Sequence, residues 1–243
     1  MNKKSLILIL VFILGIGIFS ENSEFPLVDI NEVSPSVIKE IRYEANHNFV
    51  GQQVDGYNAP KCYLTESAAN ALARVQASLL KQSLSLKVFD CYRPQQAVDH
   101  FVRWASGNEP DQTKAIYFPN IPADSLFELG YIAKRSGHSR GSTVDLAIVQ
   151  LPYQPPSEFE YNCLDEDGYK YRGSELNMGT AYDCFDVRSH TRSNLLPDSI
   201  LSNRMILLEA MEAEGFVNYS QEWWHFTFKP EEFLNTYFDV PIE

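Results

Sequence analysis

Residues 136–149, which read SGHSRGSTVDLAIV, are the stretch from which the fold is predicted. The second half of the stretch alternates between two faces, as the side chains of a β-strand do. One face carries aliphatic side chains only, namely Val144, Leu146 and Ile148. Asp145 lies on the other face, and burying a carboxylate without a partner is unfavourable. The stretch therefore predicts a sheet strand with a charged side chain whose partner could be a bound cation.

Helical patterns lie on both sides of this stretch. Apolar residues at three- and four-residue spacing predict a helix that begins at Thr65. Pro94 suits the first turn of a second helix, which would end at Gly107. Asp198 is a suitable N-cap for a third helix, and Gly215 is its expected end. Three helices are therefore expected around the strand.

Two further strands are expected, and they complete the fold class. Residues 84–90 alternate as a half-buried strand does, and residues 223–228 are rich in aromatic and β-branched side chains. Residues 21–61 are irregular, and the polar residues 150–174 form an expected inserted loop. Helices and strands do not follow a regular βαβ alternation, so the class is α+β, with a largely antiparallel central sheet and flanking helices.

The first twenty residues differ in character from the rest of the chain. Residues 1–20 contain two lysines, an apolar run from Leu6 to Phe19 and then a small residue, Ser20. This order is typical of a secretory signal peptide, and the run is shorter than the roughly 20 residues that a membrane span needs. We expect removal of the leader, no membrane span in the remaining domain (residues 21–243), and export to the periplasm or cell envelope. An uncleaved N-terminal anchor is the alternative.

The chain is acidic and rich enough in apolar residues to fold. Its 243 residues carry a formal net charge of −12, which becomes −14 without the leader because the leader holds two lysines and no acidic residue. Nucleic-acid binding needs a basic patch for the phosphates, so this class of function is excluded. With 44% apolar residues the chain can bury a full core, and one domain is the natural size.

Four cysteines agree with export. An even number in an exported chain suggests two disulfides, although four cysteines allow three pairings. We favour 62–91 and 163–184 because each pair lies near a boundary between segments. The positions are Cys62, Cys91, Cys163 and Cys184.

Two of the five histidines have a carboxylate nearby in the sequence. His138 precedes Asp145 by seven residues, and His225 follows Glu222 by three. Two imidazoles and one carboxylate form a ligand set for catalytic zinc, and a further carboxylate could accept a proton from zinc-bound water. Each spacing alone is a weak signal, and a turn histidine and a hydrogen-bonded core histidine are the alternative. In one continuous strand Glu222 and His225 would lie on opposite faces, so either Glu222 precedes the strand or a bulge turns it.

Arg93 is the third candidate, in the sequence FDCYRP of residues 89–94. It lies where a strand ends and a helix begins, a place where sites often form. A fixed cation there could stabilise a developing oxyanion. A surface salt bridge to Asp90 is the alternative, and such pairs contribute little to stability.

These residues belong to a set of motifs that resembles the VanX-type D-alanyl-D-alanine dipeptidases. Those are zinc peptidases related to D-alanyl-D-alanine carboxypeptidases and to the hedgehog signalling domain. The motifs occur in family order across roughly residues 28–241, so they cover almost the whole chain after the leader. They lie at residues 41–43, 48–51, 54–57, 89–94, 130–133, 136–145, 178–180, 183, 222–226 and 237–239.

The resemblance implies a small α+β domain whose sheet carries one zinc ion. It implies that His138, Asp145 and His225 bind this ion. It further implies that Glu222 is the general base and that Arg93 stabilises the transition state. The implied reaction is hydrolysis of the dipeptide D-alanyl-D-alanine to two D-alanines, in cell-wall turnover or in glycopeptide resistance.

The resemblance also implies a substrate site. Asp183 and Tyr57 would lie near the free amino group of the dipeptide, and Ser136 would line the pocket. The chain departs from the best-known member of the family, which is cytoplasmic, in its leader, its cysteines and the insertion over residues 150–174. A disulfide of Cys163 could hold this insertion beside Asp183, and the insertion could then alter the range of substrates.

Two other functions are weighed against this one. A carboxypeptidase or endopeptidase acting on peptidoglycan stem peptides would use the same metal in a wider site. A zinc-bearing binding module without activity would need neither Glu222 nor Arg93, so the presence of both residues speaks against it.

Overall fold

The computed structural model describes residues 25–107, 111–157, 162–164 and 172–243. The expected leader, residues 1–20, lies outside these ranges, as do residues 158–161 and 165–171 of the expected insertion. None of the helices in the described part of the chain combines the length and apolar character that crossing a membrane requires.

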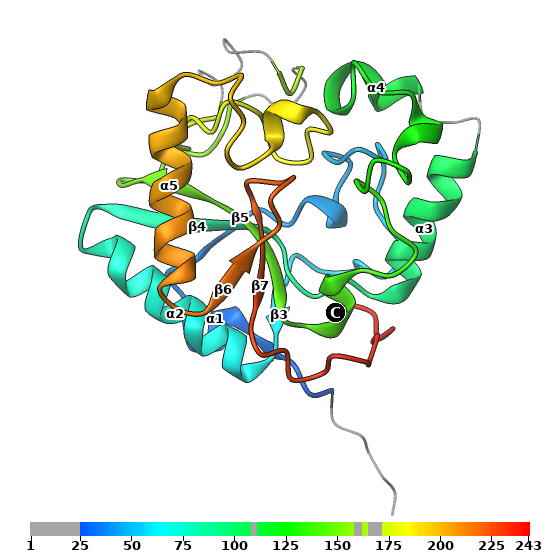
Figure 1. Cartoon of the computed structure of the whole chain (residues 1–243). Coiled ribbons are helices and arrows are strands. Elements are labelled where there is room, and N and C mark those ends of the chain that lie inside the picture. Colours follow the sequence, from blue (N-terminus) through cyan, green and yellow to red (C-terminus); the bar gives the residue numbers. More distant parts are fainter. Residues whose placement is uncertain (1–24, 108–110, 158–161, 165–171) are drawn as a thin grey trace, which may run out of the picture.

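A five-stranded sheet forms the centre of the fold (Figure 1). Its order is β2 (Ile38–Lys39), β4 (Leu84–Asp90), β5 (Thr143–Gln150), β7 (His225–Phe228) and β6 (Phe216–Asn218). The pair β2–β4 is parallel, and the other three pairs are antiparallel. A separate antiparallel pair joins β1 (Val28–Asp29) to β3 (Tyr63–Leu64). The predicted α+β class with a largely antiparallel sheet is confirmed.

Helices flank the sheet on two sides. Figure 1 shows α2 (Glu66–Leu80) and α5 (Asp198–Glu212) on one side and α3 (Gln95–Ser106) and α4 (Asp111–Tyr117) on the other. A short helix, α1 (Ile30–Val33), follows β1. Single turns of 3₁₀ helix occur at η1 (Arg42–Glu44), η2 (Ala123–Ser125), η3 (Gly137–Arg140) and η5 (Val187–Ser189).

The helix boundaries follow from local capping. The Thr65 hydroxyl accepts a hydrogen bond from the Ala68 N–H and caps α2, so the helix begins one residue after its predicted start. Helix α3 begins at Gln95, because Pro94 holds the N-cap position and not a place in the first turn, and the helix ends before Gly107 as predicted. The prediction for α5 was wrong in detail. Pro197, with the extended ψ of 151° that is typical of an N-cap, holds that position, and Asp198 is the first helical residue, where its negative charge favours the helix N-terminus.

The strand predictions need two corrections. Strand β4 is buried on both faces along its whole length, whereas burial of one face was predicted. Lys87 can lie on the second face at only 1% exposure because it forms ion pairs with Glu40 at 2.9 Å and with Glu175 at 2.8 Å. Strand β7 begins at His225, and the two tryptophans expected in it lie in the preceding turn. The bounds of β7 are set by its pairing with β5 and β6, and amino-acid composition alone does not determine them.

Both predicted disulfides are confirmed. Cys62 is bonded to Cys91, and Cys163 is bonded to Cys184. The first joins the residue that follows β4 to the residue that precedes β3, and the second joins the expected insertion to the segment beside Asp183. Both bonds are compatible with an exported protein.

Candidate active site

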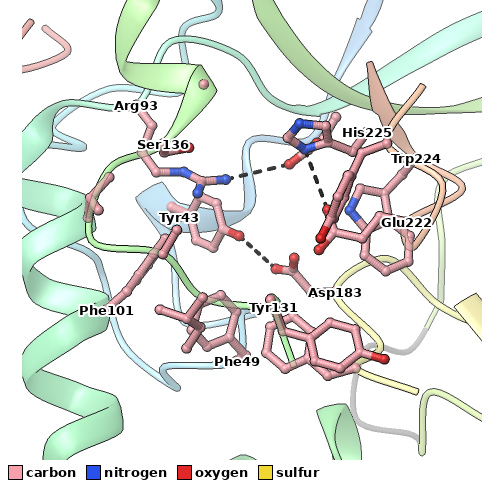
Figure 2. Close-up of a pocket in the computed structure, with 18 of the residues that line it drawn as sticks. Tyr43, Phe49, Arg93, Phe101, Tyr131, Ser136, Asp183, Glu222, Trp224 and His225 are labelled. Atoms are coloured by element: carbon pink, nitrogen blue, oxygen red, sulfur yellow. Dashed lines mark hydrogen bonds and ion pairs between the residues drawn. The ribbon is translucent and has the colours of Figure 1, made fainter. Parts of the chain in front are cut away.

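A pocket of about 240 Å³ opens beside the ends of β4, β5 and β7. Figure 2 shows its walls, with Arg93 and Ser136 approaching from one side and Glu222 and His225 from the other. Asp183 lies between these two groups. Six of the residues that the sequence suggested line this one pocket, although their positions in the chain are far apart: Arg93, Ser136, Asp145, Asp183, Glu222 and His225.

Strand pairing brings two of the three predicted metal ligands together. Asp145 of β5 lies directly opposite His225, the first residue of β7, in the antiparallel ladder. Residues opposite one another in such a ladder have Cβ atoms about 5 Å apart. His225 Nδ1 is 3.1 Å from Asp145 Oδ1 as a result.

His138 reaches the same point from η3. Its Nε2 lies 3.2 Å from Asp145 Oδ2 and 3.3 Å from His225 Nδ1. Its Nδ1 is 2.7 Å from the carbonyl oxygen of Cys91. A carbonyl in this place holds the imidazole so that Nε2 faces the other two residues, as second-shell partners of metal-binding histidines do.

The three side chains fit a metal ion. One ligand atom from each of His138, Asp145 and His225 lies within 4.8 Å of the others. Asp145 Oδ1 is buried and, among the residues that the structure describes, has no hydrogen-bond partner of acceptable geometry, although His225 is close. Burial alone would raise the pKa of Asp145, but the two histidines hold it well below its usual value, so the carboxylate is ionised. A buried, ionised oxygen without a hydrogen bond beside two imidazole nitrogens is a donor set that could bind a metal.

Glu222 lies in the turn before β7, so it reaches the same side as His225 without a bulge. Its Oε2 is 3.4 Å from His225 Nδ1, and the residue is 8% exposed. Burial, followed by the charge of Asp145, raises the pKa of Glu222 well above its usual value. The Asn218 side-chain amide donates to the carbonyl oxygens of Glu222 and His225, each at 3.0 Å, and so holds the turn. The sequence analysis missed Asn218, because a single asparagine before a turn carries no distinctive spacing.

Arg93 follows β4 and faces the metal-ligand group. Its Nε and Nη2 lie 2.9 and 2.8 Å from Asp90 Oδ2, and Nη2 is 3.5 Å from Asp145 Oδ2. The expected pair with Asp90 therefore exists, but it is buried, because the Asp90 side chain is 0% exposed. Tyr57 lies behind this pair, is 0% exposed and donates to Asp90 Oδ1 at 2.6 Å. Tyr57 is not among the residues that line the pocket, in contrast to the expected place beside the substrate's amino group.

Asp183 also lines the pocket. It is 4% exposed, has a positive φ of 59° and directly precedes the disulfide-bonded Cys184. Tyr43 donates its hydroxyl proton to Asp183 Oδ2 at 2.9 Å. Within the described residues no lysine, arginine or histidine forms an ion pair with Asp183, and burial, followed by the charge of Asp145, raises its pKa well above the usual value. The site thus presents a carboxyl group to which a cationic ligand could bind.

Sequence comparison identifies the relatives of this chain. Residues 23–154 and 165–243 match the family described as D-ala-D-ala dipeptidase. The chain belongs to this family of metallopeptidases. The D-alanyl-D-alanine dipeptidase of Streptomyces coelicolor is 37% identical over 219 residues, which cover 90% of this chain and 98% of that protein. The D-alanyl-D-alanine dipeptidase of Enterococcus faecium is 33% identical over 214 residues, which cover 88% of this chain and 96% of that protein.

The family match is interrupted between residues 154 and 165, inside the expected insertion.

Several further residues of the pocket wall are aromatic, and the sequence analysis did not assign them to the site. Tyr131 and Phe185 stack with ring centroids 5.1 Å apart, and burial raises the pKa of Tyr131 to about 12. Phe49, Phe101 and Trp224 complete this wall. Aromatic residues are common in cores, so nothing in their local sequence separates a pocket wall from ordinary packing.

Proposed function

We propose that this protein is an exported zinc dipeptidase that hydrolyses D-alanyl-D-alanine to two D-alanines. The observation that carries the proposal is the convergence of His138, Asp145 and His225 with Glu222 in a pocket of about 240 Å³. Sites for drug-sized ligands range over about 300–1,000 Å³, so this pocket suits a smaller molecule. The names of the relatives point to the same substrate.

Zinc is the metal that we propose for the three-residue site. Two imidazoles and one carboxylate leave a fourth position open for water in catalytic zinc sites. When bound, zinc would lower the pKa of that water toward about 7 and polarise the carbonyl of the substrate.

Glu222 is the general base in this proposal. Its Oε2 is within 3.4 Å of His225, so a water molecule next to the metal-ligand group would be within its reach. Glu222 takes the proton of the attacking water and then returns it to the nitrogen of the leaving D-alanine. Its burial keeps bulk water away from this proton.

Two further charged residues orient the substrate. Arg93 donates to the carbonyl oxygen on which negative charge develops, and its pair with Asp90 holds the guanidinium in place. Asp183 pairs with the ammonium group of the dipeptide, which allows the site to measure the substrate from its amino end. Ser136 also lines the pocket. We assign Tyr57 a positioning role through Asp90.

Export is supported by the leader-like composition of residues 1–20 and by the two disulfides. In the envelope the reaction would serve cell-wall turnover or glycopeptide resistance.

Purified protein assayed on D-alanyl-D-alanine and on a stem pentapeptide tests this function. We expect release of D-alanine from the dipeptide alone, loss of activity with a chelator, and recovery on addition of zinc. Cleavage of the pentapeptide with no turnover of the dipeptide would instead support the carboxypeptidase or endopeptidase alternative.

Glu222→Gln should lower kcat by about 10²–10⁴-fold, because the amide cannot accept the proton. One zinc ion per chain should remain bound. Glu209→Gln, on the exposed face of α5, is the matched control and should leave kcat unchanged. Near-normal turnover by Glu222→Gln would show that the base is another residue.

A further inference from the structure

A dipeptide has a free carboxylate as well as a free ammonium group, and the roles proposed above provide for the ammonium only. The basic side chains that line the pocket are Arg93, Arg135 and His225. Arg93 is held by Asp90 and Asp145, and His225 lies against Asp145 and belongs to the metal-ligand group. Arg135 is therefore the basic side chain at the pocket with capacity for an anion.

Arg135 lies at the rim, directly before Ser136, and its side chain is exposed to solvent. Across residues 25–107, 111–157, 162–164 and 172–243, no acidic side chain forms an ion pair with it. Arg135 combines a place in the pocket wall with the lack of an acidic partner in this part of the chain, so its charge is available to a ligand in the pocket. That ligand would carry negative charge.

The guanidinium of Arg135 is held in place by an aromatic ring. It lies 4.9 Å from the centroid of Tyr237. Arg140 lies 5.5 Å from the same centroid, but this second arginine makes a two-point ion pair with Glu231. Two arginines thus share one ring, and the one without an acidic partner is the one that lines the pocket.

Stacking leaves the edge of a guanidinium open. Its parallel N–H groups match the two oxygens of a carboxylate, and the stacked ring reduces the entropy lost when they bind. The neighbouring Ser136 hydroxyl accepts the His138 N–H at 3.2 Å, so its own proton is available for the same carboxylate. The rim therefore offers two adjacent donors, Arg135 and Ser136, in the wall of the pocket.

We propose that Arg135, stacked on Tyr237, binds the C-terminal carboxylate of the dipeptide and makes this free carboxylate a determinant of substrate choice. The inference rests on the proposed dipeptidase function. Asp183 and Arg135 then hold the two charged ends of one zwitterion, and the peptide bond lies between them near Arg93. A longer peptide would lose one of these two ion pairs.

The test compares D-alanyl-D-alanine with D-alanyl-D-alanine amide, whose C-terminus is neutral, in the wild type, Arg135→Ala and Lys134→Ala. Lys134 is the matched control, because it is the adjacent exposed cation and does not line the pocket. Arg135→Ala should raise KM for the acid about 10–100-fold, the effect of losing a charge-assisted hydrogen bond, and should change kcat by less than about threefold. KM for the amide should stay within about twofold, and Arg135→Lys should recover part of the loss. Lys134→Ala should match the wild type with both substrates.

Equal losses with the acid and the amide, or no loss with either, would overturn the role of Arg135. In both cases the wild type would still turn over the dipeptide, so the dipeptidase function would stand. If the wild type hydrolyses neither compound, the proposed function fails and this inference fails with it.

Discussion

Arg93→Ala removes a guanidinium that serves both the reaction and the buried charges around it. In the proposed reaction Arg93 donates to the developing oxyanion. Loss of one such donor lowers kcat by about 10²–10³-fold, or roughly 3–4 kcal/mol of transition-state stabilisation. Arg93 also neutralises Asp90, whose side chain is 0% exposed and contacts it at 2.8 and 2.9 Å.

The second effect reduces stability. Removing one partner of a buried ion pair costs about 3–5 kcal/mol of unfolding free energy, because the other charge is left without compensation. Burial raises the pKa of Asp90, and Arg93 and His138 oppose this rise. Without Arg93 the pKa of Asp90 should rise further, and uptake of a proton would relieve part of the cost. Tyr57 would still donate to Asp90 in the variant.

A double variant separates the two effects. Arg93→Ala combined with Asp90→Asn removes the orphaned charge, so it should recover most of the lost stability while kcat stays low. Steady-state release of D-alanine gives kcat, urea denaturation gives the free energy of unfolding, and metal analysis checks that zinc remains bound. Recovery of kcat in the double variant would refute the catalytic role of Arg93, since the single variant would then have been inactive only because its site was distorted.

Two predictions concern stability. Replacing Cys163 and Cys184 by serine should lower the unfolding free energy by about 3 kcal/mol, and replacing Cys62 and Cys91 should lower it by a similar amount, because sequence separations of 21 and 29 give nearly equal loop entropies. Urea denaturation measures both losses of unfolding free energy. A difference between them above about 1 kcal/mol would show that contacts in the folded state, and not loop entropy, determine the loss. The charges of Arg42 and Lys87 outweigh the effect of burial and lower the pKa of Glu40, so its stabilising contribution should be complete above pH 4.5 and lost as the pH falls below that value. Urea midpoints from pH 7 to pH 3 should then fall less for Glu40→Gln than for the wild type, and equal slopes would contradict this reasoning.

The long elements of the fold were predictable because their patterns repeat. Helix α2 and strands β4 and β5 each show a regular periodicity over seven or more residues, and the helix begins within one residue of its predicted start. Strands β1, β2 and β6 have two or three residues each and were not predicted. Segments this short contain no full period, so the neighbouring strand determines whether they pair.

The candidate site was predictable where its residues occur in compact motifs. His138 and Asp145 lie seven residues apart, and Glu222 and His225 lie three apart. Tyr43 was not assigned, because its partner Asp183 lies 140 residues away. Local spacing carries no information on such a contact.

The sequence by itself determines the strand face on which Asp145 lies. Side chains alternate along any extended chain, so Asp145 lies on the face opposite Val144, Leu146 and Ile148. Only the tertiary structure decides that Asp145 lies opposite His225, that Glu222 lies in the turn before β7, and that Tyr57 lies behind Arg93. Those relations depend on strand register and on packing between distant segments. Register is set by burial of the apolar face and by turn geometry, and a one-residue shift would turn Asp145 away from its partners.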